Sequence, residues 1–337
     1  MSVMNSVRQS CYVLLAAVAT LAVGATAQAQ NTQWNLASAY PATNFHTKNL
    51  QQFADDVAVA SGGRLNITIH PNGSLIKPAD LFGAVKDGKV QVAEIIMSSL
   101  NKESPVFGVD SLPFLVTGYD DAARLAANAR PIVEKLLNDR GLMLLFTVPW
   151  PPQNLYASKS VTRTADLKGS RFRTYNPATQ RISEIVGAQG VSLPANELGK
   201  AISEGKVESM ITSSTTGVDT QAWSGMRFFY KVNAWIPKNM VVFNKAAFEK
   251  LPADVRQFVQ KAAMEAEKRG WQESRNVEKF NDDTLAKNKV QVAVPSPFLQ
   301  DEFRRMGELM AREWLRTAGQ IGLDILLPYE LDRFKAK

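Results

Sequence analysis

The sequence predicts an α/β protein that is folded into two lobes. Short apolar strands alternate with helices along most of the chain, which is typical of parallel-rich sheets covered by helices. A proline-rich break at 149–152 divides this alternation into two halves. The chain has 337 residues, more than one hydrophobic core ordinarily organises. We expect one lobe to contain 30–149 and 239–280, and the other to contain 150–238 and 281–337.

Residues 1–29 have the three parts of a secretory signal. Arg8 precedes an apolar core that runs from about Cys11 to Val23, and small residues at 25–29 offer cleavage sites. The core is shorter than the roughly 20 apolar residues that span a bilayer, so a cleaved signal is favoured over a membrane anchor. Since Cys11 is the only cysteine, the mature chain would form no disulfide.

The first half is expected to hold four strands and three helices. The strand at 64–70 alternates apolar and polar residues, and Gly62 and Gly63 end the helix before it. Asp120 is a suitable cap for a helix that ends before Gly141. The strands are expected at 33–37, 64–70, 90–97 and 141–148, and the helices at 47–60, from 78 to just before Gly88, and at 121–138.

The second half repeats the pattern after the proline-rich break. Asn176 and Pro177 suit the cap and first turn of a helix that follows the strand 171–175, and Asn196 is expected to cap the helix that Gly205 ends. Further strands are expected at 191–193, 207–211 and 240–243.

One predicted helix is several times the ordinary length. From Pro252 to about Lys287 there is no further proline, and Gly270 is the only glycine, so the segment predicts a helix of some 35 residues or roughly 50 Å. A coiled-coil partner is disfavoured because the apolar stripe fades after Gly270. We therefore expect a helix that bridges both lobes. The final segment, 321–337, is consistent with either a covering tail or an interaction segment.

Composition disfavours several classes of function. The net charge is +7, or +6 after the signal is removed, but the cations are interspersed with acids and form no block for nucleic acid. With two histidines, His46 and His70, and no mature cysteine, neither a metal site nor a cofactor is expected. The sequence has no nucleophile elbow, phosphate loop or dinucleotide fingerprint. A secreted enzyme would have to use His46 with Ser213, which nothing in the sequence brings together.

Five segments, in order, resemble a known family of receptors. They read FADDVAVASGGRLNITIHPNGSL, VDSLPFLV, TADLKGSRFRTYNPAT, ANELGKAISEGKVESMITSS and LPADVRQFVQKAAMEAEKRG. Together they resemble the periplasmic receptors of tripartite ATP-independent periplasmic (TRAP) transporters, over about Leu36 to Trp314. The resemblance implies a periplasmic binding protein-like fold with a ligand cleft between the lobes, in the periplasm of a Gram-negative bacterium. It also implies a small organic carboxylate as ligand and membrane permease subunits, driven by an ion gradient, as partners. A receptor of an ATP-driven transporter is the alternative.

Arg173 is the predicted ligand-binding cation. In a strand, Arg171 and Arg173 point to the same face, and Arg173 lies nearer the carboxyl end, where clefts form. Its guanidinium is a planar fork that fits a carboxylate with two hydrogen bonds. The resemblance implies that Arg173 forms such a pair with the ligand, whereas the alternative is a salt bridge to a carboxylate of the protein.

Departures from the family pattern indicate what kind of acid is bound. Where many relatives carry an asparagine, this chain offers the hydroxyls of Thr212, Ser213 or Ser214, and Gln153 stands near the place of a second arginine. Because only one arginine is then available to pair with a ligand carboxylate, the sequence predicts a monocarboxylate. Aromatic residues near strand ends and crossings predict a flat or apolar body, such as an aromatic or hydrophobic 2-oxo or 2-hydroxy acid. The candidate ligand contacts besides Arg173 are Trp150, Tyr175, Gln153, Thr212, Ser213, Phe45, Tyr40, Ser98, Trp235 and Asn239.

Overall fold

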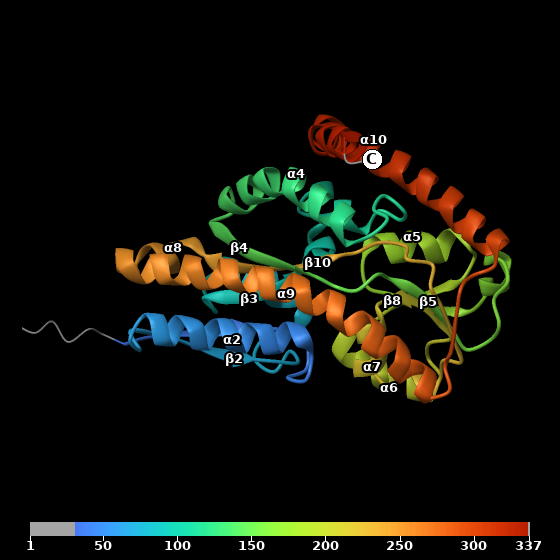
Figure 1. Cartoon of the computed structure of the whole chain (residues 1–337), viewed down its shortest axis with the longest axis horizontal. Coiled ribbons are helices and arrows are strands. Elements are labelled where there is room, and N and C mark those ends of the chain that lie inside the picture. Colours follow the sequence, from blue (N-terminus) through green and yellow to red (C-terminus); the bar gives the residue numbers. More distant parts are fainter. Residues whose placement is uncertain (1–30, 336–337) are drawn as a thin grey trace, which may run out of the picture.

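The computed structural model describes residues 31–335, so the predicted signal at 1–29 lies outside the described part. Two mixed sheets form the centres of two lobes (Figure 1). The first sheet has the order β2 (Leu65–His70), β1 (Thr32–Ala37), β3 (Val92–Ile96), β10 (Lys238–Asn244), β4 (Leu142–Pro149). The second has the order β11 (Gln291–Ala293), β9 (Phe228–Tyr230), β5 (Asn154–Ala157), β8 (Ser209–Thr212), β6 (Arg171–Thr174), β7 (Gln189–Ser192). The predicted two-lobed α/β fold is confirmed.

One strand in each sheet runs against its neighbours. Strand β10 is antiparallel to β3 and β4, and β5 is antiparallel to β8 and β9. The chain enters the second lobe through β5 and returns to the first lobe through β10. The sequence did not predict β5, β9 or β11, which have three or four residues each, because so short a strand depends on its partners rather than on its own pattern.

The two crossings between the lobes lie side by side. The Trp150 backbone N–H donates to Pro237 O at 2.8 Å, and that of Gln153 donates to Trp235 O at 2.8 Å. In return, Ala234 N–H donates to Gln153 O at 2.8 Å. The proline-rich break therefore forms one half of a two-stranded connection, which places the residues on it between the two lobes.

Helices cover both sheets, mostly where they were expected. The first lobe carries α2 (Phe45–Ala60), α3 (Leu81–Lys86) and α4 (Tyr119–Asn138), and the second carries α5 (Pro177–Ile185), α6 (Ala195–Ser203) and α7 (Ser214–Asp219). Asn176 caps α5 as predicted, since its side chain accepts from Thr179 N–H. Two predicted caps are wrong: Gly118 precedes α4, so Asp120 lies in its first turn, and Pro194 precedes α6, so Asn196 lies inside it.

The long helix is confirmed as α9 (Ala253–Lys287), which has 35 residues. It packs on α2 and β4 of the first lobe and on α7 of the second, and Figure 1 shows it crossing from one lobe to the other. Gly270 lies where α9 meets β4 and α2. A methyl group there would lie 2.5 Å from Val148 Cγ2 and 2.9 Å from Asn49 Nδ2, so only glycine permits this close approach.

A second long helix, α10 (Pro297–Lys335), was not predicted. Its backbone leaves helical geometry at Gly319, with φ 57°, a conformation that favours glycine. Before this kink, Leu299, Phe303 and neighbouring residues enter the core of the second lobe. The part that includes Trp314 and Tyr329 packs into the core of the first. The range 281–337, expected to belong to the second lobe, is thus divided between both cores.

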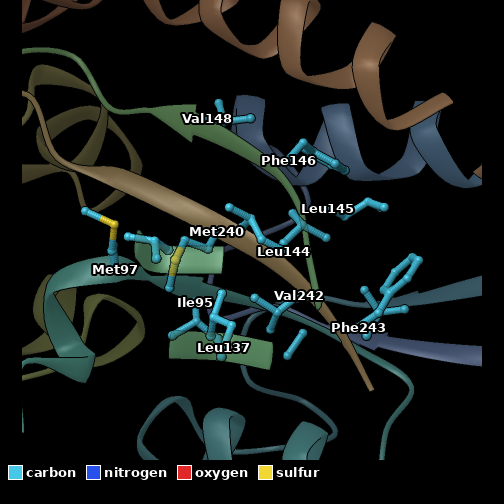
Figure 2. Packing of buried hydrophobic residues seen from close by; sticks show 14 of the residues in the cluster. Ile95, Met97, Leu137, Leu144, Leu145, Phe146, Val148, Met240, Val242 and Phe243 are labelled. Carbon is cyan, nitrogen blue, oxygen red and sulfur yellow. The ribbon is translucent and has the colours of Figure 1, made fainter. Parts of the chain in front are cut away.

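The core of the first lobe includes side chains from three neighbouring strands, β3, β10 and β4. Figure 2 shows buried side chains from β3 (Ile95), β10 (Met240 and Val242) and β4 (Leu144 and Phe146). Both faces of these strands are covered, which explains their nearly continuous apolar sequences.

Within residues 31–335, no helix is long and apolar enough to cross a membrane.

We expect Gly270→Ala to destabilise the protein, because the added methyl group would displace β4 or α2, and overpacking costs about 1–3 kcal/mol. The matched control is Gly83→Ala, an exposed helical glycine with open space around it; it should leave stability unchanged or raise it by up to about 1 kcal/mol. Chemical denaturation of both variants measures the difference. Equal or higher stability of Gly270→Ala would contradict the packing described for α9.

Candidate ligand-binding site

The predicted site residues gather where the two crossings meet the strand ends of both sheets. Arg173 is in β6 of the second lobe. Trp150 lies at the crossing that follows β4, and Asn239 lies in β10. A cavity of about 440 Å³ opens beside Trp150 and Tyr40, and residues of α6 and the end of α7 line its other side. The candidate site therefore lies between the lobes, as the sequence predicted.

Arg173 is a buried cation without a counter-charge among the described residues. It is 3 % exposed, its Nε donates to Leu193 O at 3.0 Å, and its guanidinium lies 4.4 Å from the centre of the Tyr175 ring. Burial lowers the pKa of Arg173 to about 10, and the groups that oppose this shift are the phenols of Tyr175 and Tyr40 rather than a carboxylate. The guanidinium stays charged at neutral pH. The protein thus provides a positive charge that an anion can neutralise.

Arg171, two residues earlier on β6, has a different environment. It is exposed, its Nη2 lies 3.1 Å from Glu208 Oε1, and its guanidinium also donates to Gly205 O. Arg171 therefore forms the salt bridge within the protein that was the alternative for Arg173. The choice of Arg173 over Arg171 agrees with this geometry.

Tyr175 is held in place by Gln153. The Tyr175 hydroxyl donates to Gln153 Oε1 at 3.1 Å, while Gln153 Nε2 donates to Pro151 O at 3.0 Å. The amide of Gln153 is therefore engaged in positioning Tyr175 over Arg173. Trp235 is fully buried close by, and its side chain lies near enough to the Tyr175 hydroxyl to oppose part of the rise that burial causes in the pKa of that phenol.

Asn239 organises the first-lobe side of the site. Its Oδ1 accepts from Trp150 Nε1 at 2.9 Å and from the Tyr40 hydroxyl at 3.3 Å. Its Nδ2 donates to Glu94 Oε1 at 2.9 Å. The other oxygen of Glu94 accepts from the Ser38 hydroxyl at 2.6 Å. This network fixes the rings of Trp150 and Tyr40, and burial raises the pKa of the Tyr40 phenol well above its usual range.

His46 belongs to the same cluster. It is buried, its ring centre lies 4.2 Å from those of Phe45 and Trp150, and its Nδ1 lies 3.3 Å from Glu94 Oε1. Burial lowers the pKa of His46, and Glu94 opposes part of that shift. His46 is therefore neutral at pH 7 and supports the aromatic wall.

The predicted hydroxyl groups have different environments. Thr212 is buried at the end of β8. Ser213 caps α7, because its Oγ accepts from Thr216 N–H at 3.1 Å, so its hydroxyl already serves the fold. Ser214 Oγ is buried and has no partner among residues 31–335. Ser98 Oγ accepts from Asn176 Nδ2 at 3.0 Å, a hydrogen bond that joins the two lobes.

Sequence reasoning missed Glu94 and Ser38. Glu94 is a charged residue inside the apolar stretch 90–97, which was predicted as a strand. A charge at a buried strand position needs partners, so its presence there was the available signal. Ser38 follows β1 directly, and nothing in its sequence context distinguishes it from a loop serine.

Two sheet-centred lobes, joined by paired crossings and holding an uncompensated cation between them, define a two-lobed solute-binding protein. The model of the bacterial extracellular solute-binding protein family 7 (DctP) matches residues 36–317. The chain therefore belongs to this family, the solute receptors of TRAP transporters. The family consists of solute receptors that bind small organic acids and work with membrane permease subunits.

Solved structures resemble the chain over nearly its whole described length. DctP6, a Bordetella pertussis extracytoplasmic solute receptor binding pyroglutamic acid, is 39% identical, with a TM-score of 0.87, over 89% of this chain and 99% of that one. A marine metagenome TRAP solute-binding protein specific for pyroglutamate is 38% identical, with a TM-score of 0.88, over the same shares. Among curated proteins, the C4-dicarboxylate-binding periplasmic protein DctP of Vibrio cholerae is 23% identical over 78% of this chain and 79% of that protein.

We expect Arg173→Met to abolish ligand binding and to leave the thermal midpoint of the ligand-free protein unchanged or higher. A buried cation without a partner destabilises the fold, and an apolar side chain of similar length removes that penalty. Titration calorimetry and thermal unfolding measure the two effects separately. Arg171→Met, which removes an exposed cation from the same strand, should retain binding. Binding of unchanged affinity in Arg173→Met would contradict the role inferred from the geometry.

Proposed function

We propose that this chain captures a small monocarboxylic acid in the periplasm and delivers it to the membrane subunits of a TRAP transporter driven by an ion gradient. The observation that carries the proposal is the uncompensated guanidinium of Arg173 in the second lobe, facing the aromatic cluster of the first. A carboxylate that bridges these groups would provide the missing negative charge. Bidentate Arg–carboxylate pairs are strong and directional, particularly where water is excluded.

Charge balance supports a single carboxylate. The other buried cation of the described residues, Lys238, is already paired with Asp110, with 3.2 Å between Nζ and Oδ2. The first-lobe side of the site contains the carboxylate of Glu94 behind Asn239. A second ligand carboxylate would therefore meet no free buried cation and would approach a like charge, which is unfavourable at low dielectric.

The walls of the site support a compact, flat body for the ligand. On the first-lobe side, Trp150, Tyr40 and Phe45 form one aromatic cluster, with the ring centres of Tyr40 and Trp150 4.8 Å apart. On the second-lobe side, the ring of Tyr175 packs against the guanidinium of Arg173. A small, flat ring with one carboxylate suits these surfaces.

Pyroglutamate is the first candidate within this class. It is a five-membered lactam with one carboxylate, and it is named for three receptors that are 38–39% identical to this chain over 89% of its length. Receptors of the same fold at 16–19% identity carry orotic acid, glucuronate or succinate, so the fold alone does not choose the ligand. Aromatic and hydrophobic 2-oxo and 2-hydroxy acids are the second candidates, because of the aromatic walls.

Closure of the two lobes would couple binding to transport. Hydrogen bonds such as Asn176 to Ser98 join the lobes only when the cleft is closed, and the paired crossings are short enough to act as a hinge. A ligand that contacts both lobes favours the closed form in proportion to its higher affinity for it. The closed receptor is the form we expect the permease to recognise.

We expect a thermal-unfolding screen to show strong stabilisation by pyroglutamate, because a ligand that binds only the folded state adds about 2.7 kcal/mol at a hundred times its Kd. The panel should also contain succinate, glucuronate, and aromatic 2-oxo and 2-hydroxy acids. Succinate should give little shift because of its second carboxylate, and glucuronate should give little shift because its hydroxyl-rich ring does not suit the aromatic walls. Stabilisation by the dicarboxylate but by none of the monocarboxylates would contradict the proposed ligand class.

A further inference from the structure

The two lobes are also joined at the mouth of the cleft by a carboxyl group. Asp219 is the last residue of α7 in the second lobe, and Asn44 caps α2 in the first. Asn44 Nδ2 donates to Asp219 Oδ2 at 2.6 Å. In Figure 1, the end of α2 nearest the second lobe lies beside α7. The two residues are 175 positions apart in the chain, and their hydrogen bond exists only while the lobes are together.

Asp219 has no ion-pair partner among residues 31–335, although charged groups lie on the elements around it. Lys48, one turn along α2, is exposed and acts on Asp219 from a distance. Lys200 of α6 is exposed on the opposite wall of the 440 Å³ cavity that Asp219 also lines. On α9, which packs against α7, the carboxylates Glu278 and Asp282 are taken by Lys231. His46 on α2 interacts with Glu94 instead.

We propose that Asn44 and Asp219 form a latch that closes the cleft with uptake of one proton from solvent, so that the receptor holds its ligand more tightly in mildly acidic than in neutral surroundings. The proton resides on the Asp219 carboxyl group, whose carbonyl oxygen still accepts from Asn44. This inference rests on the proposed function, because a ligand is needed to drive closure. Asp219 acts as a positioning residue, since its role is to bias the lobes towards closure, whereas Arg173 holds the ligand carboxylate.

The direction of the pH effect follows from the partial burial of Asp219. In the closed form, burial raises its pKa to about 6, although Asn44 and Lys48 lower it in part. Opening would return the carboxyl group to water and its pKa to the usual range near 3.8. The closed form therefore binds this proton more tightly than the open form. The stability of the closed form relative to the open form therefore increases as pH falls through 6. This increase is complete once the pH is below the pKa of Asp219 in the open form.

The test is titration calorimetry of the full-length mature protein between pH 5 and pH 8. With these two pKa values, the wild type should bind about tenfold more tightly at pH 5 than at pH 7. Binding heats at pH 6 in buffers of different ionisation enthalpy should reveal proton uptake. Pyroglutamate is the first probe. If it does not bind, the tightest acid of the panel replaces it, so that failure of the ligand assignment does not remove this test.

Three variants separate the latch from a merely structural role. Asp219→Asn carries a neutral, isosteric amide, so it should lose the pH dependence and bind at pH 7 as tightly as the wild type does at pH 5. Asn44→Ser keeps a good helix cap but no longer reaches Asp219; it should bind more weakly and with a shallower pH profile. Asp254→Asn, which removes an exposed carboxylate paired with Arg64, should keep the wild-type profile.

Two results would overturn the latch. One is wild-type affinity that is constant between pH 5 and pH 7. The other is an Asp219→Asn variant that keeps the wild-type pH dependence, with thermal unfolding showing that it is folded.

Discussion

Burial of the Arg173 guanidinium without a counter-charge among the described residues is the constraint on which the rest of the site depends. A desolvated cation is stable only if its surroundings hold it rigidly, and here the Leu193 carbonyl and the Tyr175 ring do so. Gln153 in turn fixes Tyr175 through its hydroxyl. The part of the charge that the protein does not neutralise is left for an anion. The folded protein thus holds a buried positive charge in place before the ligand binds, and pairing with that charge contributes to the affinity for an anion.

The architecture brings a partner surface to that cation. Because the crossings at 150–153 and 234–237 are hydrogen-bonded to each other, they place Trp150 and Asn239 beside the second lobe. Asn239 then links Glu94 to the rings of Trp150 and Tyr40, so the first-lobe wall is as rigid as the Arg173 side. The helices α9 and α10 each contact both lobes, and they limit how the lobes can move apart.

Local patterns made part of this structure predictable. The alternation of strands and helices indicated the fold class, and the absence of proline and scarcity of glycine indicated the length of α9. The family resemblance, together with the position of Arg173 near a strand end, selected Arg173 rather than Arg171 as the candidate cation. Features that depend on distant partners were not predictable. They include the short strands β5, β9 and β11, the division of α10 between the lobes, and the burial of Glu94 and His46. Gln153 and Ser213 were chosen as ligand contacts by position, yet their polar groups are engaged by Tyr175 and by the start of α7.

A crystal structure of the protein with its bound acid tests the role of Arg173 most directly. We expect the ligand carboxylate to lie within hydrogen-bonding distance of the Arg173 guanidinium, beneath the closed lobes and beside Tyr175. A bound acid whose carboxylate contacts other groups, while the guanidinium of Arg173 remains without an anion, would contradict the role of Arg173 as the ligand-binding cation.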